Sequence, residues 1–517
     1  MEFLRYRDTR GLDPSRPAFT DVILTGTAKG GGLHVPESLP SLPLPEILAL
    51  ASEPYHRRVA RVLEIFRPDI PQERIDAATA AAFSGTFDDP AVTPLREIEP
   101  GLHILEEWHG PTAAFKDLAL QCLPRLIAES LGIREAAGSE IDDLLIVVAT
   151  SGDTGSAALA GFADTPRCRV VVFYPEEGIS GTQREQILHH RGDSSAVVGV
   201  SGSFDDCQGL VKSMFDDEEW SDYLRDRHHL RLSSANSINW GRIPIQIASW
   251  ASAYADLAAR GGVRPGDPVD ICVPTGNFGN VLAAWYAGKI GVPFGRLICA
   301  SNENDALTRF LDTGIWDIRK RELIGTPSPS MDILVSSNLE RLLFEVCGDG
   351  SRVREWAHDL AATGAFEVDR ETMAAIGEIF TGDSVSNDDC LGTIRQMHLE
   401  TGYLFDPHTA VAWEVGHRQR GRAPLIVVST AHWAKFGEDI YRALNGIGFR
   451  DPLPDRAADL SRAGLLEEIT RLAPGERIPA SITALDLPAR EPPLPIGATK
   501  DAAAGAIEAW LDRSGSG

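Results

Sequence analysis

The stretch "DLLIVVATSGDTGSAALAGFA", residues 143–163, decides the fold class of this chain. An apolar run ends at Ala149, and a short polar loop then leads into small residues with helical spacing. A near-continuous apolar run is typical of a strand that is buried on both faces of a parallel sheet. The stretch therefore predicts a strand, a loop and a helix, which is the repeating unit of α/β proteins.

Five more apolar runs follow the same pattern. They cover residues 169–174, 195–200, 269–274, 296–300 and 424–429, and helical patterns such as "SFDDCQGLVKSMFDD" and "NVLAAWYAGKIG" lie between them. This alternation predicts an α/β fold with open parallel sheets. Ligands of such folds bind beyond the carboxyl ends of the strands, so the loops there are the candidate functional segments.

Composition divides the chain into three parts. Residues 1–100 are rich in proline and short helical patterns, and predict a smaller N-terminal domain. The alternating pattern fills residues 101–450, and residues 451–517 form a proline-rich C-terminal extension. A chain of 517 residues is too long for one hydrophobic core, so more than one domain is expected.

Charge and cysteine usage narrow the possible functions. The formal net charge of −25 repels phosphate backbones, so we expect no nucleic acid partner. The chain has no apolar signal core at its N-terminus and no apolar run near the ~20 residues that span a bilayer, so we expect no membrane partner. Seven single cysteines without a CxxC pair indicate reduced thiols in a cytoplasmic protein and no metal site.

The loop "ATSGDTGS" in the opening stretch is the first candidate site. Hydroxyls, free backbone N–H groups and a helix N-terminus converge there, and this combination binds phosphate or carboxylate groups. Ser151, Asp153 and Thr154 are the candidate side chains. The alternative is an ordinary capped helix with Ser151 or Asp153 at the N-cap.

The stretch "ICVPTGNFGNVLAAWYAGK", residues 271–289, is the second candidate. Gly276 and Gly279 allow close approach of the backbone, while Asn277 and Asn280 tolerate unusual dihedral angles. The pattern is neither GxGxxG nor a P-loop, so it does not indicate a dinucleotide or ATP. A backbone cradle for a single phosphate is the functional interpretation, and a tight strand-to-helix turn is the alternative.

Two further segments complete the set. In "PLIVVSTAHWAKFGED", residues 424–439, the hydroxyl of Ser429 or Thr430 could bind a ring nitrogen, or could simply end the strand and cap a helix. In "GPTAAFKDLALQ", residues 110–121, Lys116 follows Phe115 and small residues whose packing would desolvate the amine and lower its pKa. A solvated lysine at a helix N-terminus is the alternative. Together, a reactive lysine, a phosphate cradle and a hydroxyl for a pyridine nitrogen are what pyridoxal phosphate needs.

These motifs, in this order, resemble the threonine synthases of the long-chain type, which belong to the tryptophan-synthase-β-like, fold type II pyridoxal phosphate enzymes. The resemblance covers roughly residues 1–445. It implies two open parallel-sheet α/β subdomains in the catalytic core and a smaller N-terminal domain. Its other motifs are "FTDVILTGTAKGGGLHVPESLP", "NSINWGRI", "SNENDALTRFLDTG", "PSPSMDILVSSNLERLLFE" and "TGYLFDPHTAVAWE".

The resemblance also implies roles for single residues. Lys116 would be the lysine that forms the Schiff base, and Thr430 would face the pyridine nitrogen. The cofactor phosphate would be held by Gly276, Asn277, Phe278 and Asn280. The substrate would be bound by Ser151, Asp153, Thr154, Asn239 and Arg242.

The last two of these, Asn239 and Arg242, are candidates for the substrate phosphate, since an arginine can bind phosphate through two nitrogens. A structural salt bridge is the alternative for Arg242, and we expect His408 to be structural. Two residues depart from the family pattern: Trp433 replaces an expected proline, and Pro124 should interrupt the helix after Lys116.

The activity that the resemblance implies is the conversion of O-phospho-L-homoserine and water into L-threonine and phosphate. Two alternatives use the same lysine and phosphate cradle. One is a phospho-lyase that acts on phosphohomoserine and releases 2-oxobutyrate, and the other is a serine or threonine dehydratase.

Overall fold

Two open sheets form the centre of the computed structural model, which describes residues 3–138, 141–176, 178–486 and 493–514. The larger sheet runs in the order β13 (Phe380–Ser384), β10 (Phe294–Ser301), β9 (Val269–Pro274), β14 (Leu425–Ser429), β4 (Leu102–Glu106) and β3 (Leu95–Glu99). The smaller sheet runs in the order β15 (Ile496–Gly497), β7 (Ser195–Ser201), β6 (Cys168–Pro175), β5 (Asp143–Ala149) and β8 (Leu230–Ser233).

All neighbouring strands in the two sheets are parallel except β3, which pairs with β4 in the antiparallel sense. Every residue of β9 and β14 is buried, because helices cover both faces of a parallel sheet. The predicted α/β fold with open parallel sheets is therefore confirmed. Each of the six apolar runs is a strand, with ends that differ by at most two residues.

Helices connect the strands and pack on the sheets. Those of the core are α5 (Lys116–Ala136), α6 (Asp153–Phe162), α7 (Gly181–His189), α8 (Phe204–Phe215), α9 (Glu218–His228), α10 (Arg242–Ala259), α11 (Gly279–Ile290), α12 (Ala306–Thr313), α13 (Leu339–Cys347), α14 (Gly350–Thr363), α15 (Arg370–Gly377), α16 (Asn387–Thr401), α17 (Pro407–Arg418) and α18 (Gly437–Asn445). Two short 3-10 helices, η3 (Pro329–Met331) and η4 (Trp433–Phe436), lie in loops, and a small antiparallel pair joins β11 (Ile315–Asp317) to β12 (Ala365–Glu367).

The N-terminal segment packs on the larger sheet's side of the molecule. Its elements are β1 (Tyr6–Asp8), α1 (Phe19–Thr25), η1 (Lys29–Gly31), β2 (His34–Pro36), α2 (Leu44–Ala49), η2 (Leu50–Ser52), α3 (Tyr55–Ile65) and α4 (Gln72–Phe83). Helices α2 and α3 contact α10, and α4 contacts α5. The rings of Tyr6 and Trp240 lie 5.7 Å apart in one shared hydrophobic core. A domain boundary near residue 100 stays a prediction, because apolar packing continues across it.

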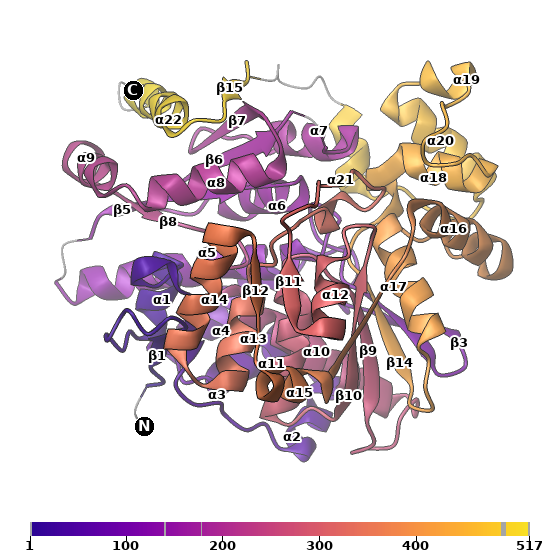
Figure 1. The fold of residues 1–517 in the computed structure, drawn as a ribbon, viewed down its shortest axis with the longest axis horizontal. Helices are drawn as coiled ribbons and strands as arrows, with labels where there is room; N and C mark the ends of the chain where they lie inside the picture. Colours follow the sequence, from indigo (N-terminus) through magenta and orange to yellow (C-terminus); the bar gives the residue numbers. More distant parts are fainter. Residues whose placement is uncertain (1–2, 139–140, 177, 487–492, 515–517) are drawn as a thin grey trace.

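The C-terminal extension reaches both halves of the molecule (Figure 1). Its elements are α19 (Asp455–Ala458), α20 (Arg462–Leu472), α21 (Ala480–Thr483), η5 (Ala484–Asp486), the edge strand β15 and α22 (Lys500–Ser514). Helix α20 packs on α18, whereas α22 packs on α8 beside the smaller sheet. The indole of Trp433 is buried and donates to Oε2 of Glu476 in this extension at 3.1 Å. The extension thus accommodates the unexpected tryptophan.

The prediction that Pro124 interrupts a helix is wrong, because α5 continues from Lys116 through Pro124 to Ala136. A proline lacks the N–H group that would bond to the carbonyl of Leu120 four residues earlier. At Gly161 of α6, an added Cβ would lie 1.8 Å from that carbonyl oxygen. The proline therefore lies where α6 closely approaches α5, and only glycine fits at position 161 opposite it.

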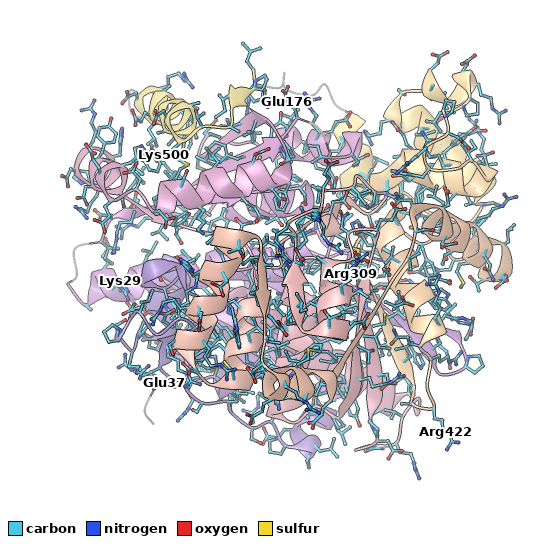
Figure 2. The ribbon with its side chains drawn as sticks, viewed as in Figure 1. Lys29, Glu37, Glu176, Arg309, Arg422 and Lys500 are labelled. Atoms are coloured by element: carbon cyan, nitrogen blue, oxygen red, sulfur yellow. The ribbon has the colours of Figure 1, made fainter. Side chains whose placement is uncertain are left out.

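The site elements meet between the two sheets. In Figure 1 the smaller sheet lies above the larger one. The loop after β14 pairs with the loop after β4 at Ala431 and Ala114, and it contacts the start of α6, after β5, through Lys435 and Asp153. Figure 2 shows charged side chains such as Lys29, Glu37 and Arg422 at the outer edge of the ribbon, where they are exposed. The charged groups described below are instead buried in the interior.

Candidate active site

The loop before α5 is shaped to present Lys116. The carboxylate of Asp117 accepts hydrogen bonds from the main-chain N–H and the hydroxyl of Thr112, both at 2.8 Å. Gly110 leaves room for that carboxylate, since an added Cβ would lie 2.4 Å from Cβ of Asp117. The N–H of Phe115 donates to the carbonyl of Thr430 at 2.8 Å. These contacts fix Lys116 as the first residue of α5, beside the end of β14.

The amine of Lys116 is desolvated. Its side chain is 11% exposed, and Nζ lies 3.4 Å from Oδ2 of Asp153 and 3.4 Å from Oγ of Ser330. Burial lowers the pKa of Lys116, and the charges of Arg242 and Lys435 lower it further, whereas Asp153 raises it. Burial dominates, so the neutral nucleophilic form of the amine is more accessible than in a solvated lysine. The predicted desolvation of Lys116 is thus confirmed. The alternative, a solvated lysine at a helix N-terminus, is wrong.

The loop after β5 is held by a hydroxyl that the sequence did not single out. Thr150 Oγ1 accepts from the main-chain N–H groups of Gly152 at 2.9 Å and Gly155 at 2.8 Å. Gly152 occupies the N-cap position with φ 127°, where an added Cβ would lie 2.5 Å from the side chain of Gln183. Neither Ser151 nor Asp153 caps the helix, so the capped-helix alternative is wrong. Thr154 lies with Asp153 in the first turn of α6.

Asp153 is a buried carboxylate surrounded by donors. Oδ1 contacts Nζ of Lys435 at 2.8 Å and Nε2 of Gln183 at 2.8 Å. Oδ2 accepts from the hydroxyl of Ser330 at 2.8 Å. Its pKa lies well below the usual value because, although burial raises it, the nearby cations Lys435 and Lys116 outweigh the burial. Asp153 is therefore ionised and links the two lysines.

The glycine-rich loop after β9 forms a tight cradle. An added Cβ at Gly276 would lie 2.8 Å from the carbonyl oxygen of Ser330, so only glycine fits. The carbonyl of Gly276 accepts from the hydroxyl of Ser336 at 2.8 Å, and that of Asn277 accepts from Nδ2 of Asn338 at 3.0 Å. With the loop's carbonyls bonded to this neighbouring segment, its N–H groups at the start of α11 remain as donors for an anion.

Phe278 and Asn280 contribute to this cradle through the backbone. Phe278 adopts a left-handed conformation, φ 62°, at the N-cap of α11, and its buried ring packs on Phe380 at 5.5 Å. The side chain of Asn280 is buried, where Nδ2 donates to Glu107 and Oδ1 accepts from the indole of Trp250. The side chains of Phe278 and Asn280 thus support the loop from the core.

The two hydroxyls at the end of β14 differ in their surroundings. Oγ of Ser429 accepts from the indole of Trp108 at 2.9 Å and from Oγ1 of Thr409 at 2.9 Å. Within the described residues, no hydrogen bond engages the hydroxyl of Thr430, whose carbonyl anchors the loop before Lys116. Of the two, Thr430 therefore has the free hydroxyl.

Arg242 and Asn239 lie in the same turn but face different groups. Arg242 is buried; Nη1 donates to the carbonyl of Ala235 at 3.1 Å, while Nε has no partner among the described residues. Burial lowers the pKa of Arg242 to about 10. A salt bridge for Arg242 is absent from the described residues. Asn239 donates from Nδ2 to the carbonyls of Ile23 and Ser234, so its amide orders the turn.

Ser330 is a side chain of the site that the sequence did not single out. Ser330 bridges Lys116 and Asp153, and its N–H donates to Nε2 of His408 at 3.2 Å. Nδ1 of His408 lies 2.8 Å from Oδ1 of Asp406, which fixes the ring with Nε2 as the acceptor. This contact agrees with a structural role for His408. The loops that carry the predicted site residues thus meet, whereas the side chains of Asn239, Phe278 and Asn280 contact other groups in the core.

Two features of the described residues bear on other function classes. No group of three or more histidine, cysteine, aspartate or glutamate side chains there could hold a metal ion. None of the helices in the described ranges is both long and apolar enough to cross a membrane.

Comparison with known proteins shows which family the chain resembles. Residues 5–83 match the family model of the threonine synthase N terminus, residues 87–428 that of pyridoxal-phosphate dependent enzymes, and residues 409–474 that of the threonine synthase C-terminal region. Threonine synthase of Pseudomonas aeruginosa is 38% identical over 463 residues, which cover 88% of this chain and 93% of that protein.

A relative named threonine synthase-like 1, from Pongo abelii, is 41% identical over 436 residues, or 82% of this chain. The chain spans 58% of the length of that relative. The crystal structure of pyridoxal-phosphate-bound threonine synthase from Brucella melitensis has 33% identity and a TM-score of 0.81, and the match covers 98% of this chain and 99% of that one.

Proposed function

The chain belongs to the threonine synthase family of pyridoxal-phosphate-dependent enzymes, and from this premise we propose that it converts O-phospho-L-homoserine and water into L-threonine and phosphate. One observation carries the proposal. A desolvated lysine, Lys116, lies beside a glycine cradle and a buried arginine whose Nε has no partner in the described part of the chain. A reaction on a phosphorylated amino acid needs this combination of a nucleophilic amine and two anion sites.

The residues present fit pyridoxal phosphate. Gly276 and Asn277 would hold its phosphate through main-chain N–H groups at the start of α11, where a Cβ at position 276 would meet backbone. The free hydroxyl of Thr430 would face the ring nitrogen. Lys116 would bind the aldehyde carbon, since its burial favours the neutral amine.

When bound, the cofactor supplies an electron sink that acidifies the C–H bonds beside the substrate amine. Lys116 would accept the proton from the α-carbon at Nζ and return it later, because it is within reach and has a lowered pKa. Ser330 and Asp153 would border that amine at 3.4 Å without forming a tight ion pair with it.

The substrate brings a carboxylate and a phosphate of its own. We assign the carboxylate to the loop after β5, where Ser151, Thr154 and the N-terminus of α6 lie together. The substrate phosphate is assigned to Arg242, whose buried Nε is a donor without a partner among the described residues. Asn239 would act by ordering the turn that carries Arg242.

Product analysis tests the proposed reaction. Purified protein is incubated with pyridoxal phosphate and O-phospho-L-homoserine, and threonine, phosphate and 2-oxobutyrate are measured together. Threonine equal to the phosphate released is the expected result. Phosphate with 2-oxobutyrate in place of threonine would assign the chain to the phospho-lyases instead. Lys116→Ala should abolish both products, whereas Lys212→Ala, which alters an exposed lysine on α8, should not.

We also propose that the protein works in the cytoplasm. All seven cysteines are free and six of them are buried, which suits a compartment that keeps thiols reduced. Fractionation of the source cells with an antibody to the chain tests this location, and recovery outside the cytoplasmic fraction would contradict it.

A further inference from the structure

A second lysine, Lys435, is buried as deeply as any group in the site. Its side chain is 0% exposed, and Nζ lies 2.8 Å from Oδ1 of Asp153 and 2.7 Å from the carbonyl oxygen of Thr112. The carbonyl of Lys435 accepts from the hydroxyl of Ser180, and its N–H donates to the carbonyl of His432. Lys435 therefore joins the loop before Lys116, the loop after β5 and the start of α7.

The two lysines share one carboxylate unequally. Lys435 and Gln183 both occupy Oδ1 of Asp153 at 2.8 Å, and Ser330 occupies Oδ2 at 2.8 Å. Lys116 also approaches Oδ2, but only to 3.4 Å. A separation of 3.4 Å is long for a charge-assisted hydrogen bond, which is normally ~2.7–2.9 Å. The shorter contacts to Asp153 thus come from Lys435, Gln183 and Ser330, and Lys116 forms the longest one.

We propose that Lys435 is a positioning residue that neutralises Asp153 and thereby keeps this carboxylate from binding the amine of Lys116 in a tight ion pair. The inference rests on the proposed function in one respect: Lys116 must be free to react with a carbonyl compound. A tight pair would hold the amine as an ammonium ion, which has no lone pair for the reaction.

The charges around the pair support this assignment. The groups that face Lys116 are Asp153 on α6, Arg242 on α10 and Lys435 in η4; Asp153 also faces His408 on α17. Among the charged groups that act most strongly on Lys116, Asp153 is the carboxylate, and it raises the pKa of the amine. Lys435 opposes this effect twice, because it repels the ammonium form of Lys116 directly and pairs with Asp153.

Uptake of pyridoxal phosphate by the apo-protein measures the state of Lys116 without any turnover. The rate constant for the rise in cofactor absorbance is recorded between pH 6 and pH 10, and its midpoint reports the deprotonation of the amine. Lys435→Met should move this midpoint to higher pH and slow uptake several-fold at neutral pH. If Lys435→Met only disturbed the structure, the uptake rate constant would be lower at every pH and its pH midpoint would not move.

Matched variants separate the causes. Lys435→Arg keeps the charge and should restore the parent midpoint, and Lys212→Met, an exposed lysine on α8, should not change it. The double variant Asp153→Asn/Lys435→Met should return the midpoint to the parent value or below, because the carboxylate is gone. A midpoint unchanged in Lys435→Met, or equally raised in the double variant, would overturn the proposal.

Two further measurements test the proposal if Lys435→Met folds poorly. Lys435→Gln retains hydrogen-bonding groups without the charge and should shift the midpoint in the same direction as Lys435→Met. Competitive acetylation of the apo-protein, with the Lys116 peptide quantified by mass spectrometry, gives the pH midpoint of the amine when cofactor uptake is too slow to follow. Neither measurement uses O-phospho-L-homoserine, so failure of the proposed reaction would leave this inference standing.

Discussion

The side-chain amide of Asn280 donates to Oε2 of Glu107 at 2.8 Å, across the buried contact between helix α11 and the end of β4. Ser249 donates to the other carboxyl oxygen at 2.6 Å, and the indole of Trp250 donates to Asn280. Asn280 lies in the first turn of the helix that starts at the glycine-rich cradle. Glu107 therefore supports the cradle from the core side.

Replacement of Glu107 by glutamine should remove the part of the pH dependence of the unfolding free energy that comes from this carboxyl group. Burial raises the pKa of Glu107 to about 7, above the ordinary value of 4.5, so the folded chain binds an extra proton between these two values. The stabilisation is full below pH 4.5 and is lost as the pH rises through about 7, a change of about 3 kcal/mol. Glutamine has the shape of the neutral acid, and its NH2 group can face Ser249. Because glutamine does not ionise, this loss of stability should be absent from the variant.

The measurement is urea unfolding of parent and Glu107→Gln at pH 5 and pH 8. The parent should lose more stability than the variant between these two values. Equal losses in both proteins would mean that Glu107 is ionised throughout.

Gly276→Ala should weaken the binding of pyridoxal phosphate about tenfold to a hundredfold, the cost of ~1–3 kcal/mol for an overpacked site. The new Cβ would lie 2.8 Å from the carbonyl oxygen of Ser330 and 3.3 Å from Cα of Met331, both backbone atoms. Equilibrium titration of the apo-protein with the cofactor provides the measurement. The control is Gly288→Ala, further along α11, where an added Cβ meets nothing within 4 Å. Unaltered affinity in Gly276→Ala would exclude this loop as the cradle.

Arg242→Ala should raise the KM for O-phospho-L-homoserine about tenfold to a hundredfold, since a hydrogen bond to a charged group contributes ~1.5–3 kcal/mol. Affinity for the cofactor should change much less, because the cradle at Gly276 is a separate set of donors. Steady-state kinetics and cofactor titration are compared with those of Arg264→Ala, whose arginine side chain is 87% exposed. An unchanged KM would remove Arg242 from the substrate site.

Ile507→Ala should destabilise the protein by about 3 kcal/mol, because it deletes most of a fully buried side chain. This residue lies on α22, which packs on α8 and covers the smaller sheet. Leu494→Ala, at a side chain that is 91% exposed, is the matched control and should have no measurable effect. Equal stabilities of the two variants in urea would show that the C-terminal helix does not support the smaller sheet.

Local sequence patterns were sufficient to predict much of the secondary structure of this protein. Apolar runs such as residues 143–149 predicted buried strands because a central parallel strand excludes water on both faces. Gly276 and Lys116 could be singled out for a similar reason: close backbone approach needs glycine, and a buried amine needs small or aromatic neighbours. Short or edge strands such as β15 escaped prediction, since two residues carry no periodicity.

Tertiary structure decided how the charged groups are paired. Asp153 and Lys435 are far apart in the sequence, and only the meeting of the loops after β5 and β14 brings them to 2.8 Å. The same holds for Ser330 and His408, and for Asn280, whose side chain turns to Glu107 rather than to the cradle. The sequence by itself determined the elements and pointed to the desolvated lysine, because these depend on local burial and backbone conformation. The electrostatic state of that lysine depends on long-range contacts, which only the folded chain creates.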